Sequence, residues 1–338
     1  MQLVNSTDTI SDKMTSPNKP CHRRVGRGSL EKTVGGSSKD AVVLEGVHKS
    51  FNGVRAVDGL DLRVPAGCIY GLLGPNGAGK TTAIRMIMDI LRPDRGRIEV
   101  LGAPSARQAK DRVGYMPEER GLYPRMKIRN VLAFLAALKG VPRAEIAERI
   151  QSWLRTMDLT EWGEKEVRDL SRGMQRRLEF IATVISDPEL IVLDEPFAGL
   201  DPLNLDLVRE AILRMRASGK TTILSTHLME QAENLCDHIL LINRGQKVLD
   251  GSLDQIRAPY QSNAVVVELE GDAGFIESLP MVLGVTRTGR KITIDLREKG
   301  GDQELLQELV GRVRVRAFEL KVPSLHEIFV RVVGGPHG

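Results

Sequence analysis

The sequence predicts an α/β protein with a largely parallel sheet, followed by a small α+β domain. Short apolar runs that read as fully buried strands alternate with segments of helical periodicity, and the clearest runs are 69–73, 190–194, 222–226 and 238–243. Buried strands separated by helices are typical of a parallel sheet that is covered on both faces. After Gly251 the pattern restarts with shorter elements, which indicates a second folded unit.

The length of 338 residues also favours two folded units, because it exceeds the usual size of one domain. Residues 1–40 are rich in Ser, Thr, Gly, Pro and Lys and have no apolar periodicity, so we expect a disordered tail. This tail is basic, since it holds seven Lys or Arg against four Asp or Glu. We place the first folded unit at 41–255 and the second at 256–338.

The first unit opens with strand patterns across 42–64, from which we expect an antiparallel β portion. The buried strand 69–73 follows and leads through a glycine-rich turn into a helical segment at 81–91. The stretch from about 116 to 187 is different, because its segments have helical spacing: 127–140, 144–157 and 172–185. We interpret this stretch as a helical insert in the α/β body.

The second unit alternates strands and helices in the order strand-helix-strand-strand-helix-strand, with one more helix at its end. The predicted strands are 264–270, 285–288, 291–297 and 313–320, and the predicted helices are 275–280, 303–312 and 325–333. The two middle strands are expected to form a hairpin around Gly289. This order is that of a ferredoxin-like domain, and its sequence contains no glycine loop, nucleophile or metal-ligand cluster.

One glycine-rich segment fits the phosphate-loop pattern G-x-x-x-x-G-K-[ST] and lies where that pattern requires, between a buried strand and a helix. Glycines allow the backbone to bend so that successive N–H groups point at phosphate oxygens, and the helix N-terminus adds its positive dipole end. Lys80 would reach the β- and γ-phosphates, and the hydroxyl of Thr81 would bind Mg²⁺. The residues predicted to bind ATP here are Gly74, Pro75, Asn76, Gly77, Ala78, Gly79, Lys80, Thr81 and Thr82.

Two acidic residues at the end of the buried strand 190–194 supply the second part of the predicted site. The carboxyl end of this strand in an open parallel sheet places Asp194 beside the phosphate loop, where it would hold Mg²⁺ through its hydration shell. Glu195, the next residue, would polarise the attacking water. A phosphate loop paired with an acidic strand end predicts a P-loop NTPase.

The segment 170–175, which reads LSRGMQ, narrows the class further. It resembles LSGGQ, the signature of the ABC (ATP-binding cassette) ATPases, with Arg172 and Met174 in place of Gly and Gln. Ser171 also makes a good N-cap for the amphipathic helix after it, and a capped helix N-terminus is itself an anion site. The resemblance implies that Ser171 and Gly173 contact the γ-phosphate of ATP bound to a second subunit.

The resemblance covers about 41–255 and implies roles for further residues. Phe51 stands where the family stacks an aromatic ring on adenine, while a core Phe at a strand end is the other interpretation of its local pattern. The segment 198–201 is similar to the D-loop, which crosses the dimer interface. His227 corresponds to the switch histidine that contacts the γ-phosphate.

Glu118 stands in place of the family's Q-loop glutamine, and the resemblance implies that its carboxylate approaches Mg²⁺ or the water. The segment 121–124, GLYP, is implied to belong to the surface that contacts a permease. The end of the chain resembles the short C-terminal extension of export-type cassettes, including bacterial ATPases assigned to sodium or drug efflux.

Composition weighs against other classes of function. The tail accounts for most of the formal net charge of +4, so a nucleic-acid partner is not expected. The three cysteines, Cys21, Cys68 and Cys236, are widely spaced, so neither a disulfide framework nor a zinc site follows. The sequence has no run of eighteen apolar residues and no apolar stretch of a signal peptide at its start. We therefore expect a cytoplasmic protein, and the resemblance to ABC cassettes implies that it is peripheral on the cytoplasmic face of the cell membrane.

Together these observations predict an ATP-hydrolysing subunit of an ABC transporter that powers export through a separate membrane permease. We expect a homodimer, or a paired cassette, around two ATP molecules with Mg²⁺, in which Glu195, Lys80 and His227 carry the catalysis. One alternative is an ABC ATPase acting on the ribosome or DNA, but only about 90 residues separate Lys80 from Ser171, without sustained heptads. The other alternative, a module that binds ATP without turnover, is disfavoured by Glu195 and His227.

Overall fold

The computed structural model describes residues 40–119, 121–260, 263–298 and 300–334. The predicted tail therefore lies outside the described residues, with the exception of Asp40. This residue is the first of a β-strand and pairs with Pro65 on the neighbouring strand, so it does not belong to a tail. The first folded unit begins one residue earlier than the apolar pattern predicted, because a polar residue at a strand end carries no apolar signal.

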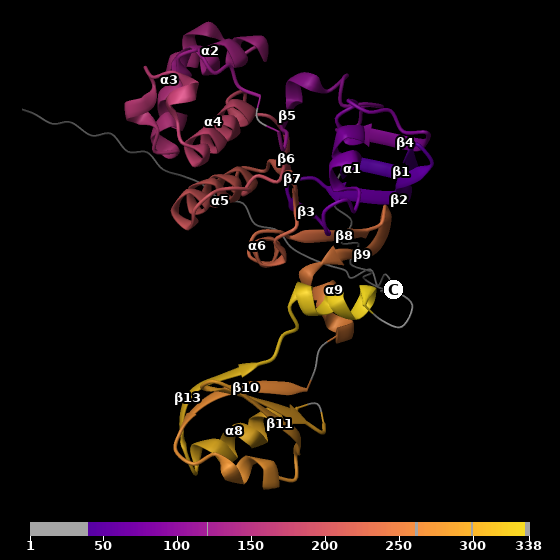
Figure 1. The fold of residues 1–338 in the computed structure, drawn as a ribbon, viewed down its shortest axis with the longest axis vertical. Helices are drawn as coiled ribbons and strands as arrows, with labels where there is room; N and C mark the ends of the chain where they lie inside the picture. The colour runs from indigo at the N-terminus through magenta and orange to yellow at the C-terminus, as the bar shows by residue number, and fades with distance from the viewer. Residues whose placement is uncertain (1–39, 120, 261–262, 299, 335–338) are drawn as a thin grey trace, which may run out of the picture. The chain divides into compact units, whose positions relative to one another are not determined.

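A six-stranded sheet forms the centre of the first unit, in the order β5-β6-β7-β3-β8-β9 (Figure 1). Neighbouring strands are parallel except for β8 and β9, which are antiparallel. The strands are Val113–Met116 (β5), Leu190–Asp194 (β6), Thr221–Thr226 (β7), Ile69–Leu73 (β3), His238–Asn243 (β8) and Gln246–Ser252 (β9). The four buried runs of the sequence are the four inner strands, which confirms the α/β prediction.

Strand β3 shows why these runs are apolar throughout. Ile69 and Leu73 belong to the hydrophobic core on one face of the sheet, whereas Tyr70 and Leu72 belong to the core on the other face. Successive side chains of a strand point to opposite faces, so a strand covered on both sides needs apolar residues at every position. At Gly71 a Cβ would lie 2.9 Å from the sulfur of a buried cysteine, so the packing leaves no room for a side chain.

A three-stranded antiparallel sheet and helix α1 cover one face of the central sheet, as the strand patterns across 42–64 predicted in part. The strands are Asp40–Phe51 (β1), Val54–Pro65 (β2) and Arg95–Val100 (β4), in the order β2-β1-β4, and α1 is Lys80–Ile87. The helix is shorter than the predicted 81–91, since Asp89 already has a left-handed backbone with φ +55°.

Helices cover the other face of the central sheet and bury their apolar sides in one common core. The three segments predicted to be helical form α2, α3 and α4, which lie together as a group (Figure 1). The helices are Ile128–Leu138 (α2), Arg143–Thr156 (α3), Arg172–Val184 (α4), Pro202–Ala217 (α5) and Met229–Glu233 (α6), with short 3₁₀ segments at Lys110–Arg112, Thr160–Trp162 and Val167–Asp169.

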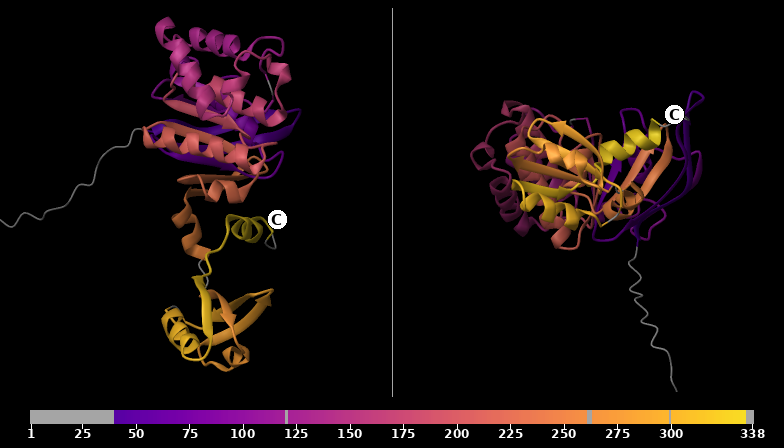
Figure 2. Two further views of the ribbon diagram at one scale, coloured as in Figure 1. Left: turned by 90° about the vertical axis from the view of Figure 1, so that its left-hand side faces the viewer. Right: turned by 90° about the horizontal axis from the view of Figure 1, so that it is seen from below.

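The end of the chain forms a separate four-stranded antiparallel sheet with its own hydrophobic core. Its order is β11-β12-β10-β13, and helix α8 and a 3₁₀ segment pack on the same face of it (Figure 2). The elements are Leu253–Arg257 (α7), Ala258–Tyr260 (3₁₀), Ala264–Glu270 (β10), Gly274–Ser278 (3₁₀), Val282–Thr288 (β11), Lys291–Leu296 (β12), Asp302–Val310 (α8), Arg314–Leu320 (β13) and Leu325–Val333 (α9). We keep ferredoxin-like as the proposed description, with the 3₁₀ segment where a helix was expected.

The last helix, α9, does not join the core of the four-stranded sheet. Leu325 and Ile328 are buried in the core of the first unit, and the backbone N–H of Leu325 donates to the carboxylate of Glu233 on α6. The Ser324 hydroxyl accepts from the N–H of Glu327 and fixes the start of the helix. The chain thus returns to the first unit after the small sheet is complete.

Candidate functional site

The phosphate loop connects β3 to α1 and is fixed by close backbone contacts. Gly74 and Gly79 have φ values of +153° and +110°, and a Cβ on either would lie 2.2 and 2.4 Å from the main-chain oxygens of Ile242 and Ala56. Only glycine fits these two positions. Helix α1 begins at Lys80 without a side-chain cap, so its first N–H groups are available to an anion.

Lys80 is buried and lies across its own loop. Its Nζ donates to the carbonyl oxygens of Gly74 at 2.8 Å and Pro75 at 3.2 Å, and it lies 3.7 Å from Oε1 of Glu195. A flexible ammonium with three donors can exchange such carbonyl partners for phosphate oxygens. The predicted phosphate-binding lysine and the predicted water-activating glutamate therefore face each other.

Asp194 ends β6 with a fully buried carboxylate. Its Oδ1 accepts from the hydroxyl of Thr81 at 3.3 Å and from the hydroxyl of Ser225. Its Oδ2 is buried and has no hydrogen-bond partner among the described residues. A buried, unpartnered carboxylate oxygen costs free energy unless a cation or water binds it. Together with the Thr81 hydroxyl, this oxygen fits the hard oxygen ligands that Mg²⁺ prefers.

Glu195 has a strained backbone and a closely held side chain. Its φ of +49° lies in the left-handed region, and the next residue is Pro196, which further restricts it. Such a conformation costs about 1–3 kcal/mol and persists only where the surroundings hold it. The Glu195 N–H donates to Oγ of Ser225 at 3.0 Å, and Oε1 lies 3.1 Å from Nδ1 of His227.

The phosphate loop, Lys80 and Glu195 line a cavity of about 290 Å³. Asp194 and His227 are not among its lining residues, but each contacts one of them, Thr81 and Glu195 respectively. The residues lining it are Ala56, Asn76, Gly77, Ala78, Gly79, Lys80, Thr81, Thr82, Glu118 and Glu195. Most of the predicted ATP-binding residues thus meet at one place, and Glu118 joins them from the end of β5. Of the lining residues, Ala56 was not expected from the sequence, because a small residue in a strand has no distinguishing pattern.

Phe51 lies outside this cavity lining, at the tip of the β1–β2 hairpin. It is paired with Val54, its side chain is 47% exposed, and the Nζ of Lys49 lies 5.6 Å from its ring centre. The core interpretation of this residue is therefore wrong, and its ring is available to stack on a planar ligand.

Ser171 and Gly173 are also absent from the residues lining the cavity. The Ser171 hydroxyl accepts from the N–H of Met174 at 3.3 Å, as expected of an N-cap of α4. A Cβ on Gly173 would lie 3.4 Å from the side chain of Asn204, near the start of α5. Asp201 caps that helix by accepting from the N–H of Asn204 at 3.0 Å. The structure does not bring the 170–175 segment to the phosphate loop of its own chain.

Two further residues of the site, besides Ala56, were not predicted from the sequence. Ser225 bonds to both Asp194 and the N–H of Glu195, and Arg176 on α4 donates to the main-chain oxygens of both acidic residues. Each residue shows a sequence feature that could have drawn attention to it. Ser225 is a polar residue inside a buried strand, and Arg176 is a charged residue on the buried side of a helix. Neither signal identifies the partner, which is distant in sequence.

Comparison with known proteins matches both parts of the chain to described families. Residues 57–198 match the family described as ABC transporter, and residues 251–333 match the C-terminal domain of DrrA1-3-like ATP-binding proteins. An uncharacterized ABC transporter ATP-binding protein of Bacillus subtilis, YhaQ, is 39% identical over 293 residues, which cover 87% of this chain and 98% of the relative.

Two further relatives have names that mention drug resistance or export. The daunorubicin resistance ATP-binding protein DrrA3 of Streptomyces coeruleorubidus is 34% identical, covering 87% of this chain and 96% of its own. The Nod factor export ATP-binding protein I of Rhizobium sp. (strain N33) is 36% identical, and the match covers 88% of this chain and 98% of that protein. A solved structure of an ATP-binding subunit of an ABC transporter has a TM-score of 0.62 and 28% identity, covering 65% of this chain and 93% of that one.

Proposed function

The chain belongs to the ATP-binding proteins of ABC transporters, and on that premise we propose that it powers export through a separate membrane permease. The observation that carries the proposal is that Lys80 and Glu195 line one cavity beside the phosphate loop, with His227 within hydrogen-bond distance of the Glu195 carboxylate. A site that only stored nucleotide would need no carboxylate aimed at the γ-phosphate position. Family membership itself implies ATP hydrolysis, and the roles of the individual residues are our proposal.

We assign the triphosphate to the phosphate loop and the N-terminus of α1. Lys80 leaves the carbonyl oxygens of its own loop and pairs with the β- and γ-phosphates. Phe51 stacks on the adenine from the hairpin tip. Thr81, Asp194 and Glu118 are the candidate ligands for Mg²⁺, which would neutralise phosphate charge when bound. The unpartnered Oδ2 of Asp194 supports that assignment.

Glu195 is the proposed group that activates the attacking water. Its carboxylate lies within hydrogen-bond distance of His227, which holds it from one side and faces solvent on the other. His227 is then placed to contact the γ-phosphate, so its contacts would differ between the ATP-bound and the ADP-bound site. The strained backbone of Glu195 supports a functional role, because strain of this kind concentrates at working sites.

Dimerisation completes the site in this proposal. Ser171 and Gly173 lie at the start of α4 and away from the residues that line the cavity, so they need a second copy to meet a γ-phosphate. A head-to-tail pair places the α4 N-terminus of each copy over the phosphate loop of the other. Two ATP molecules would then be held between the two copies.

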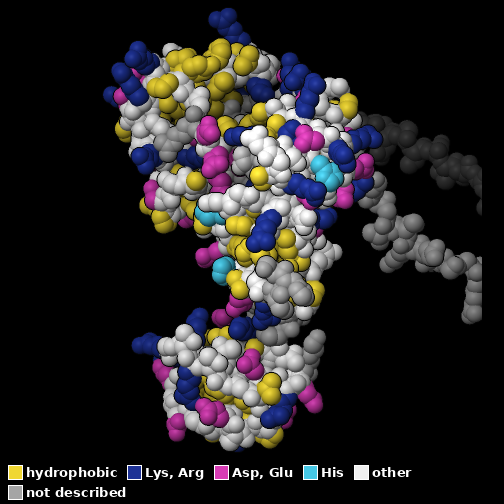
Figure 3. Space-filling view, turned by 45° about the vertical axis from the view of Figure 1, so that its right-hand side comes forward, with side chains coloured by type: hydrophobic (Ala, Val, Ile, Leu, Met, Phe, Trp, Pro, Cys, Tyr) yellow, Lys and Arg dark blue, Asp and Glu magenta, His cyan; other side chains and the backbone are white. Residues whose placement is uncertain are grey.

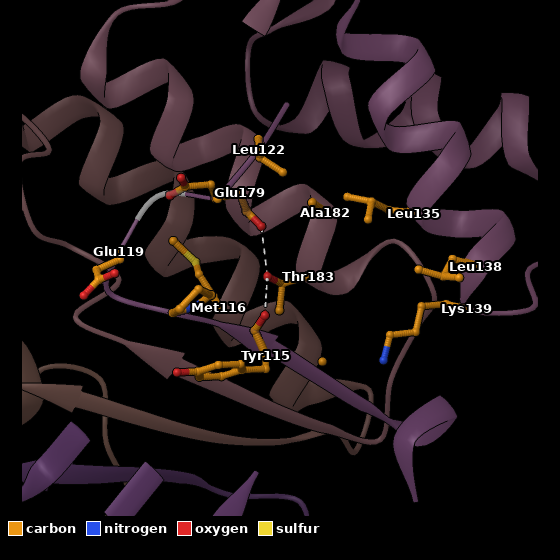
Figure 4. A pocket seen from close by; sticks show the side chains of 13 residues that line it. Tyr115, Met116, Glu119, Leu122, Leu135, Leu138, Lys139, Glu179, Ala182 and Thr183 are labelled. Atoms are coloured by element: carbon orange, nitrogen blue, oxygen red, sulfur yellow. Dashed lines mark hydrogen bonds between the residues drawn. The ribbon is translucent and has the colours of Figure 1, made fainter. Parts of the chain in front are cut away.

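The permease contact is proposed on the group formed by α2, α3 and α4. Hydrophobic side chains gather on the upper surface of this group in Figure 3. Phe134 and Leu138 of α2, and Tyr123 in the segment before it, are exposed apolar side chains. A mostly apolar cavity of about 230 Å³ opens beside them, between the 114–122 segment and α2 and α4 (Figure 4). Exposed apolar surface of this kind marks sites of interaction.

In the described ranges, no helix combines the length and apolar character that crossing a bilayer requires. We therefore propose that a partner forms the membrane path and that this subunit is peripheral, on the cytoplasmic face. The names of the two relatives above mention daunorubicin resistance and Nod factor export, which supports export as the direction of transport.

The Glu195→Gln protein tests this site. We expect ATP turnover to fall by about 100-fold or more, since general base catalysis contributes at least that factor, while ATP binding persists. Size-exclusion chromatography with light scattering should show an ATP-dependent dimer of this variant. Adding Ser171→Glu should abolish the dimer without abolishing ATP binding, because it places a charge against the partner's γ-phosphate. Normal turnover by Glu195→Gln would contradict the proposed catalytic role.

A further inference from the structure

Arg176 is a buried arginine of α4 whose hydrogen bonds to main-chain oxygens all lie at the acidic end of the nucleotide site. It is 3% exposed, and its Nη2 donates to the main-chain oxygens of Asp194 and Glu195, both at 2.7 Å. Its Nη1 donates to the main-chain oxygens of Pro117 at 3.0 Å and Glu118 at 3.4 Å. One guanidinium therefore holds four carbonyl groups from two segments that are distant in sequence.

These two segments follow neighbouring parallel strands. β5 ends at Met116 and β6 ends at Asp194, and the two strands pair in register along their length. The rigid, forked guanidinium of arginine can donate to both strand ends at once, which the single nitrogen of lysine cannot do with the same geometry. Arg176 thus fixes the spacing between the residue proposed to activate water and the segment that contains Glu118.

The main chain of Glu195 depends on this contact. Its N–H is held by Ser225 and its carbonyl oxygen by Arg176, so both polar groups of a left-handed residue are fixed. Without the arginine, Glu195 would be free to rotate about its N–Cα bond, from φ +49° toward a commoner conformation. Rotation about this bond moves the side chain with it and would swing the carboxylate away from Lys80 and His227, which lie 3.7 and 3.1 Å from it.

A purely structural explanation of Arg176 is that a buried charge needs partners. Arg177, the next residue, is such a case: it is also buried, and it donates to the main-chain oxygens of Met157 and Asp158, within the helical group. Among the residues that the structure describes, Arg177 makes no hydrogen bond or ion pair with the acidic strand end. Replacing Arg177 therefore shows the loss of stability when a buried arginine is lost. Replacing Arg176 shows, in addition, the effect of losing the contact with the main chain of Glu195.

Glu179 forms an ion pair with Arg176 and also lines the mostly apolar cavity beside α2 and α4. Glu179, one turn along α4, accepts from Nη1 of Arg176 at 3.0 Å, and it also lines the cavity of about 230 Å³ (Figure 4). Thr183 supports the same wall by donating to the main-chain oxygen of Glu179 at 2.9 Å. The guanidinium is thereby oriented between the cavity wall and the nucleotide site.

We propose that Arg176 is a positioning residue for ATP hydrolysis, which holds the main chain of Glu195 in its left-handed conformation and so aims the Glu195 carboxylate. This inference rests on the proposed role of Glu195. Arg176 does not touch the reacting atoms, so its removal acts on turnover and not on nucleotide binding.

The test compares Arg176→Lys with Arg177→Lys in the full-length protein. We expect Arg176→Lys to lower kcat per nucleotide-binding site by about 10–100-fold, since small misplacement of a catalytic group has effects of this size, with KM for ATP changed by less than about threefold. Arg177→Lys should lower the melting temperature at least as much and keep kcat per site within about twofold. The charge-neutral pair Arg176→Gln with Glu179→Gln repeats the test without an unpaired buried charge.

Unchanged kcat in Arg176→Lys, or an equal loss of kcat in both lysine variants, would overturn the proposal. A further arm separates this inference from the proposed function. If Glu195→Gln retains normal turnover, the role of Glu195 fails, and the inference about Arg176 fails with it. If Glu195→Gln is inactive while Arg176→Lys is normal, only the inference about Arg176 fails. When Arg176 acts through Glu195, Arg176→Lys should not slow the Glu195→Gln protein any further.

Discussion

Ser225 holds the acidic end of the site from inside the sheet, and Ser225→Ala should destabilise the first unit and slow hydrolysis. The hydroxyl lies in a fully buried strand, where it donates to Oδ1 of Asp194 and accepts from the N–H of Glu195. A hydrogen bond to a charged group contributes about 1.5–3 kcal/mol, and a buried N–H left without a partner costs about 1–3 kcal/mol. We therefore expect Ser225→Ala to lower the free energy of unfolding by about 3 kcal/mol.

Calorimetry measures this loss directly. For a unit of this size, 1 kcal/mol corresponds to about 2–4 °C, so the melting temperature should fall by about 6–12 °C. The transition of the first unit is recognised because ATP shifts it upward. Turnover should fall as well, since the main chain of Glu195 loses one of its two anchors.

Thr222→Val is the matched control in the same strand. The Thr222 hydroxyl is buried and has no hydrogen-bond partner among the described residues. Replacing it by a methyl group removes an unsatisfied polar atom, so the melting temperature should stay the same or rise. The reasoning is refuted if Ser225→Ala melts within about 2 °C of the unchanged protein, or if Thr222→Val is equally destabilising.

Three further outcomes follow from the packing. Gly79→Ala should abolish ATP binding measured by fluorescent-nucleotide titration, because its Cβ would collide with a main-chain oxygen at 2.4 Å; binding within threefold of normal would contradict this. Burial raises the pKa of the Cys68 thiol to about 12 and also raises the pKa of the Cys236 thiol. In a variant that lacks Cys21, both thiols should therefore resist alkylation at pH 8 until urea unfolds the protein. Rapid labelling of either thiol in the folded protein would contradict this burial. Ile328→Ala should cost about 2–5 kcal/mol in the melting of the first unit, where its side chain is buried; a shift confined to the small sheet would show that α9 packs elsewhere.

The inner strands and the phosphate loop could be predicted from sequence because their requirements are local. Strand β3 needs apolar side chains toward both cores, and the phosphate loop is one contiguous glycine-rich pattern between a buried strand and a helix. The N-cap role of Ser171 is equally local, since its partner is three residues away. Such constraints determine the residue types within a short segment, so they can be recognised in the sequence.

The missed elements carry weaker or less local signals. Strand β4 buries only one of its six residues, and β5 has only four residues, so neither shows a clear apolar pattern. The contacts of Ser225 and Arg176 join residues that the fold brings together from distant parts of the sequence. Their side chains could be noted as polar groups in buried places, but the partners depend on the register of the sheet and the position of α4.

The most direct test of the central claim is the identity of the protein that binds this subunit in its own cell. The Glu195→Gln protein, tagged and trapped with ATP, would be purified from detergent-solubilised membranes and its partners identified by mass spectrometry. A multi-spanning membrane protein in matching amount is the result that the account predicts. Ribosomal or DNA-bound partners, with no membrane protein, would contradict the transport function and leave the ATPase assignment standing.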